Sequence, residues 1–141
     1  MVKNMIIACA TDDKLNFIDR HFGDAKFYCI FDVTTDSIRL LQTIENTTEE
    51  ERQHADPQKA KSVMQLLKEE GTQGVINKAF GPNIKPIAKL LVPVITNETL
   101  IEDGVKQLQN LLSQIEENIS QNRKIYVKIS GNNEAKIFEI N

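Results

Sequence analysis

The feature that most constrains the fold is the apolar run NMIIACAT at residues 4–11. It lacks the polar alternation of a strand with one face in water, and a continuous apolar run is typical of a strand covered on both faces. Such a strand needs helices above and below its sheet. We therefore expect residues 4–11 to form a central strand of an α/β domain.

Four further segments are rich in branched or aromatic residues and predict strands. Residues 26–33 and 37–45 are separated by a turn-prone link and predict an antiparallel hairpin. Residues 73–77 and 92–96 predict two shorter strands. Pro93 favours a sheet edge or a strand start, because proline cannot donate to a central ladder.

Two helices are marked by their terminal residues. The first is expected to open with Asp56 as N-cap and Pro57 in the first helical position, and to stop at Gly71. The second, a short helix, is expected to open at Gly81 and Pro82.

A third helix is expected over residues 99–119, where Thr99 and Glu102 have the spacing of a capping box and an apolar stripe follows. Beyond it, the turn-forming residues 130–133 separate two short strand-like segments and predict a hairpin. We expect this hairpin, in residues 122–141, to extend the domain that residues 1–121 form.

The resulting order, β-β-β-α-β-α-β-α with a C-terminal hairpin, predicts a three-layer α/β sandwich with a mixed sheet, in which an antiparallel meander precedes parallel strands. If residues 4–11 and 73–77 are parallel neighbours, the loops that follow them meet at one rim of the sheet, where such sheets bind ligands. One loop contains His21, and the other contains residues 78–83.

Charge and cysteine content exclude several classes of protein. A net charge of −3 argues against a basic nucleic-acid-binding face, and no apolar run approaches the roughly 18 residues of a membrane span. The N-terminus turns polar too early for a secretory signal. The two cysteines, Cys9 and Cys29, supply neither a disulfide framework nor a Cys-x-x-Cys motif. We expect a cytoplasmic monomer or homodimer without nucleic-acid or membrane partners.

Several motifs, taken in order, resemble a known family. They are IIACATDD, HFGDAKFYCIFDV, a helix ending in LLKEEG, GVINKAFGPN and TNETLIEDGVKQL. Together they resemble the dinitrogenase iron-molybdenum cofactor-binding family of nitrogenase accessory-factor-like proteins over roughly residues 4–112. The resemblance implies a ribonuclease H-like fold and non-catalytic binding or carriage of an iron-sulfur-type cofactor, with cofactor-assembly proteins as partners. The loop NTTEEERQHADP departs from the family, which often has more histidine, glycine or cysteine there, and residues 122–141 are unmatched.

The donor chemistry favours a cluster that arrives preassembled, because a conventional iron-sulfur cluster needs about four protein thiolates. His21 is the candidate ligand, since neutral imidazole binds iron well. Cys9 and His54 are secondary metal-ligand candidates. Imidazole coordinates only when deprotonated and has a reference pKa of about 6.5, so binding should weaken below roughly pH 6.

The residues around His21 predict an anion-binding rim. Gly23 allows close approach of backbone amides, and the helix start at residues 81–83 presents unpaired N–H groups. Positive side chains nearby add charge-assisted contacts. The expected cofactor-binding residues are Arg20, His21, Phe22, Gly23, Lys78, Gly81, Pro82 and Asn83.

Other interpretations stay open. A histidine in a turn often only faces water, Gly-Pro-Asn is by default a helix start, and Cys9 is most simply a packing residue. One alternative function is a protein-interaction or regulatory module that uses the C-terminal hairpin and has no small ligand. Another is a metal-dependent nuclease, although only Asp12 or Asp13 is well placed among its candidate carboxylates, which also include Asp24 and Asp32. We expect no turnover, because neither histidine is paired in sequence with a credible nucleophile.

Overall fold

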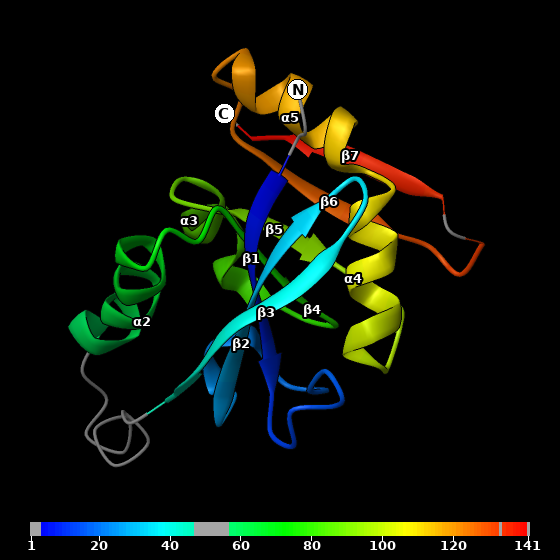
Figure 1. The fold of residues 1–141 in the computed structure, drawn as a ribbon. Coiled ribbons are helices and arrows are strands. Elements are labelled where there is room, and N and C mark those ends of the chain that lie inside the picture. Colours follow the sequence, from blue (N-terminus) through cyan, green and yellow to red (C-terminus); the bar gives the residue numbers. More distant parts are fainter. Residues whose placement is uncertain (1–3, 47–56, 133, 141) are drawn as a thin grey trace.

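The framework of the molecule is a mixed β-sheet. The computed structural model describes residues 4–46, 57–132 and 134–140, within which seven strands form one sheet in the order β3-β2-β1-β4-β5-β6-β7 (Figure 1). The strands are β1 (Asn4–Thr11), β2 (Phe27–Thr34), β3 (Ile38–Glu45), β4 (Gly74–Asn77), β5 (Val92–Ile95), β6 (Ile125–Ile129) and β7 (Ala135–Glu139). β1 runs antiparallel to β2 and parallel to β4. The central position predicted for the apolar run is therefore confirmed.

Helices cover both faces of this sheet. α2 (Pro57–Glu69) and α3 (Ile84–Ala88) pack on one face, and α4 (Ile101–Gln109) and α5 (Leu112–Ser120) pack on the other (Figure 1). The α/β class and the mixed sheet are confirmed, whereas a specific likeness to ribonuclease H stays a prediction. Gly71 follows the end of α2 with a φ of +85°, while Asp56 lies outside the described residues. In the described part of the chain, no helix combines the length and apolarity needed to cross a membrane.

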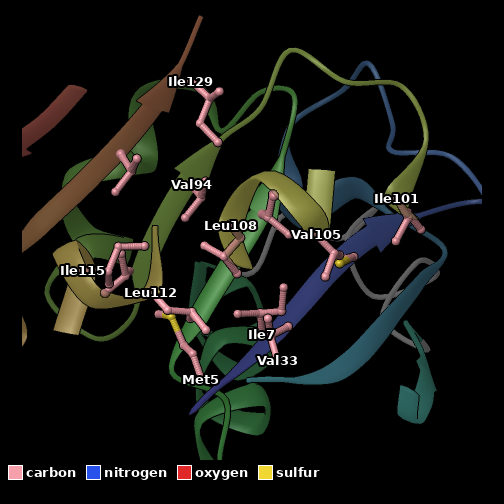
Figure 2. Close-up of a cluster of buried hydrophobic side chains, with 14 of the residues drawn as sticks. Met5, Ile7, Val33, Val94, Ile101, Val105, Leu108, Leu112, Ile115 and Ile129 are labelled. Carbon is pink, nitrogen blue, oxygen red and sulfur yellow. The ribbon is translucent and has the colours of Figure 1, made fainter. Parts of the chain in front are cut away.

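Two cores hold the layers together. The larger lies between the sheet and helices α4 and α5, where Val105 and Leu108 pack with Ile7 of β1 (Figure 2). Fully burying one such side chain contributes about 1.5–3 kcal/mol relative to exposure, so this core fixes α4 on the sheet. The second core lies on the α2 face and includes Phe22 and Phe80, both from loops at the rim.

The prediction of one helix over residues 99–119 is wrong. The chain forms α4 and α5, which are separated at Asn110 and Leu111, where Leu111 has φ −107° and ψ 0°. The apolar stripe continues across the break into the same core through Leu112, so its spacing did not reveal the break. The stripe also ends before Ile119, which is 39% exposed.

The predicted capping box at the start of α4 is also wrong. Leu100 is the N-cap residue, and no side chain caps the helix. The Thr99 carbonyl instead accepts the backbone N–H of Phe17 (2.8 Å), and Asn16 forms a bridge with Leu100. Pairing with Asn16 and Phe17 keeps residues 99 and 100 extended, so the helix begins only at Ile101.

The C-terminal hairpin, β6 and β7, makes β5 an interior strand despite its proline. β6 pairs parallel to β5 at Val94 and Ile95, and β7 pairs antiparallel to β6. Pro93 pairs with Val75 of β4 but lies before the stretch paired with β6. Its missing N–H therefore falls near the start of the strand. Of the two placements predicted for Pro93, a sheet edge or a strand start, the structure has the second.

Candidate functional site

Two loops meet at the rim formed by the carboxyl ends of β1 and β4. These strands are parallel neighbours; the loop after β1 carries His21, and the loop after β4 carries Gly81. A Cβ atom built on Gly81 would lie 2.6 Å from Cε1 and from Nε2 of His21. The imidazole of His21 thus rests directly on the Gly81 backbone, and the predicted meeting of the two segments is confirmed.

Asn77, the last residue of β4, ties these loops together. Its buried side chain accepts the backbone N–H of Ile18 at Oδ1 (3.2 Å). Its Nδ2 donates to the carbonyl oxygens of Arg20 and Ala79, both at 2.9 Å. Sequence reasoning missed Asn77. The available signal was a carboxamide at the end of an apolar strand, where a buried polar group needs hydrogen-bond partners.

Phe22 anchors the histidine turn from the interior. It begins a short 3₁₀ turn, η1 (Phe22–Asp24), and its buried ring lies 5.4 Å from the ring of Phe80 and 5.0 Å from that of Tyr28, measured between centroids. The Tyr28 hydroxyl donates to the Phe22 carbonyl (2.9 Å). Phe22 is therefore placed to support the turn and not to meet a ligand at the surface.

Asn46 holds the other side of the same turn. Its Nδ2 donates to the carbonyl oxygens of Ala25 (2.8 Å) and Gly23 (3.2 Å), and within the turn the Asp24 N–H donates to the His21 carbonyl (2.9 Å). The side chain of His21 is nevertheless exposed. The result is an accessible imidazole on a backbone that buried residues fix in place.

Both predicted cations at the rim already pair with carboxylates. Nζ of Lys78 lies 2.6 Å from Oδ1 of Asp19. The Arg20 guanidinium donates to both oxygens of Asp12 (2.8 and 3.1 Å), and this hydrogen bonding lowers the pKa of the Asp12 carboxyl. An anion at the rim would therefore compete with Asp19 and Asp12 for these side chains.

The two rim glycines do different things. Gly81 has a φ of +69°, a left-handed conformation that favours glycine, whereas a Cβ on Gly23 would meet nothing within 4 Å, so its backbone borders open space. Gly81 also begins η2 (Gly81–Asn83), with Pro82 exposed, and the five-residue α3 follows. The side chain of Asn83 lies outside the described part. So short a helix has a small dipole, and the predicted anion cradle is correspondingly weak.

The remaining predicted donors lie elsewhere. Cys9 is fully buried in the α4-side core, and burial raises the pKa of its thiol. Cys29, its partner across β1 and β2, is buried too. His54 falls outside the described residues. Of the three predicted metal donors, the structure places His21 at the rim.

The carboxylates that follow β1 serve the local turn. Asp13 accepts the backbone N–H groups of Asn16 (2.8 Å) and Leu15 (2.9 Å), which lowers its pKa. Asp12 is occupied by Arg20. Among the residues that the structure describes, no group of three or more His, Cys, Asp or Glu side chains is placed to hold a metal ion.

Fold and rim together define an α/β domain of the mixed-sheet class, with an exposed histidine held at the carboxyl ends of two parallel strands. Residues 3–111 match the family model described as dinitrogenase iron-molybdenum cofactor. The chain belongs to this family, which links it to processes that involve the iron-molybdenum cofactor. No curated protein matches the chain.

Proposed function

We propose that the chain binds and carries a preassembled iron-molybdenum cofactor, or a related iron-sulfur cluster, without converting it. Family membership supports the class of cargo. The observation that carries the proposal is the exposed imidazole of His21, which rests on the Gly81 backbone, while the buried side chain of Asn77 fixes the preceding backbone through the Arg20 carbonyl. A turn that is already ordered loses little conformational entropy when it binds.

The donor set suits a finished cluster. Two buried cysteines do not supply the roughly four thiolates of a conventional site. A cluster that brings its own sulfide and organic ligands needs one or two protein donors, and imidazole is a good ligand for iron. His21 would supply this nitrogen, while the bare backbone at Gly23 leaves room for a large cargo to approach.

Arg20 and Lys78 would assist an anionic cargo by exchanging partners. In each ion pair one side chain is well exposed, Asp19 at 82% and Arg20 at 49%, although Lys78 and Asp12 are partly buried, so both pairs are partly screened by solvent. Pairs of this kind contribute only about 0–1 kcal/mol. Their release therefore costs little when a multiply charged anion arrives.

The test is an anaerobic titration of the purified full chain with isolated iron-molybdenum cofactor, followed by visible absorption and by co-elution in gel filtration. We expect His21→Ala to weaken binding at least tenfold. Gln114→Ala, which removes a neutral polar side chain from an exposed position on α5, is the matched control and should stay within twofold of wild type. Equal affinity of wild type and His21→Ala would contradict histidine ligation.

A protein-interaction role is the second candidate. Leu15 and Leu100 are 67% and 47% exposed, and their backbone segments are joined, since the Ile101 N–H donates to the Leu15 carbonyl (2.9 Å). This apolar pair fits a docking role, and a carrier also needs a surface that meets the recipient of its cargo. A folded wild-type chain that binds no cluster anaerobically would leave the interaction role as the better interpretation.

A further inference from the structure

The C-terminal hairpin has one buried face and one partly exposed face. Along β6 the residues alternate between buried and accessible, and Ile125, Val127 and Ile129 join the core under α4 and α5. Alternate residues of a strand point to opposite sides of the sheet. The other side of the hairpin, here called the hairpin face, consists of Tyr126, Lys128, Lys136 and Phe138.

An aromatic pair forms one half of the hairpin face. Tyr126 and Phe138 are directly opposite each other in the β6–β7 ladder, and their rings stack with centroids 4.8 Å apart and planes 13° from parallel. Phe138 is 37% exposed. Phe138 packs on Tyr126 but keeps more than a third of its surface accessible, so part of this aromatic pair is available to a flat ligand.

Two opposed lysines form the other half. Lys128 lies directly opposite Lys136, and both are exposed. Like charges at such a position destabilise a sheet, so the arrangement favours an anion between them. In the described part of the chain no ion pair links either lysine to a carboxylate. Glu134 lies two positions before Lys136 and lowers the local charge, but no ion pair joins the two among the described residues.

The charge of this segment differs from that of the whole chain. Residues 122–140 contain four basic and two acidic side chains, whereas the net charge of the protein is −3. The whole-chain value, on which the expectation of no nucleic-acid partner rested, therefore hides a local excess of positive charge. These residues also lie beyond the part that matches the family, residues 3–111.

We propose that the hairpin face binds single-stranded nucleic acid. A base stacks on the Tyr126–Phe138 pair, in which Phe138 is exposed and Tyr126 partly exposed, and the adjoining phosphates lie between Lys128 and Lys136. Aromatic side chains on a sheet with neighbouring cations are the features that single strands recognise, because every base has a stacking face and every linkage a charge. An acidic peptide would use the lysines but gain nothing from the rings, and a duplex keeps its base faces hidden.

The test is fluorescence anisotropy with a labelled single-stranded oligoadenylate of about 10 nucleotides and the full chain at low salt. Lys128→Gln/Lys136→Gln should weaken binding at least tenfold, and Phe138→Leu, which keeps the apolar cover, at least fivefold. The logarithm of the affinity should fall with the logarithm of salt concentration with a slope of about −1.4 to −2.1, as for two or three phosphates.

Lys68→Gln/Lys106→Gln is the matched control, since it removes the same charge from exposed sites on α2 and α4 and should stay within twofold of wild type. Circular dichroism checks folding, and loss of the opposed lysines should not lower the melting temperature. Absence of binding, equal loss in the control, or equal competition by duplex or by polyglutamate would overturn the proposal. His21→Ala should leave nucleic-acid binding unchanged. The nucleic-acid proposal and the cofactor proposal can therefore be refuted separately.

Discussion

Replacing Gly81 with alanine tests the contact on which the candidate site depends. The left-handed conformation at φ +69° costs an L-residue about 1–2 kcal/mol. The new Cβ would lie 2.6 Å from two ring atoms of His21, against an ordinary separation of about 3.5–4.0 Å, so the ring must move by about 1 Å. Because His21 is exposed, it can swing away, and the contact adds little to the loss of stability.

The expected result is a modest loss of stability with a larger loss of binding. One kcal/mol lowers the melting temperature by roughly 2–4 °C for a chain of about this size, so Gly81→Ala should melt about 2–8 °C lower in circular dichroism. Anaerobic titration should show weaker cofactor binding, because the imidazole is displaced. Gly81→Asn should recover part of the stability, since asparagine tolerates this conformation, but not the binding.

Gly23→Ala is the matched control for stability. Its Cβ would meet nothing within 4 Å, so the melting temperature should stay close to that of wild type. If Gly81→Ala melts at the same temperature as Gly23→Ala, the strain attributed to the left-handed conformation of residue 81 is refuted. If it melts lower but binds the cofactor normally, the seating of His21 is irrelevant to the site.

Three further predictions concern the support of the rim and the core. Asn77→Ala should destabilise the fold by about 2–4 kcal/mol in urea unfolding, because it removes the partner of the buried Ile18 N–H and of the part-buried carbonyl oxygens of Arg20 and Ala79; a loss below 1 kcal/mol would contradict this. Gly104→Ala should be destabilising by about 1–3 kcal/mol despite the better helix propensity of alanine, because its Cβ would collide with the ring of Phe17; a melting temperature at or above that of wild type would show that the ring yields freely. The lowered pKa of Asp12 means that its pairing with Arg20 stabilises the fold above the unfolded pKa of about 3.9 and is lost as the pH falls through the lower folded value. The difference in unfolding free energy between wild type and Asp12→Asn, measured from pH 7 to pH 2, should therefore shrink at the acidic end, and a constant difference would argue against the ion pair.

The sequence by itself determined the elements whose signals are local. The apolar run at 4–11 predicts a strand covered on both faces, proline and glycine bracket α2, and turn residues at 130–133 predict the hairpin. The family could be recognised from short motifs in order, and residues 3–111 confirm it. Local signals succeed here because strand burial, helix ends and turns depend on residues a few positions apart.

Only the tertiary structure decided what the rim consists of. Asn77 bonds to Ile18, 59 positions away, and the pairing of Lys78 with Asp19 depends on β1 and β4 becoming neighbours. The break between α4 and α5 leaves no trace in the apolar spacing, because both helices keep facing one core. The opposed lysines of the hairpin face are likewise set by strand register. Such contacts are fixed by which segments pack together, a choice made by the whole chain and not by any short stretch of it.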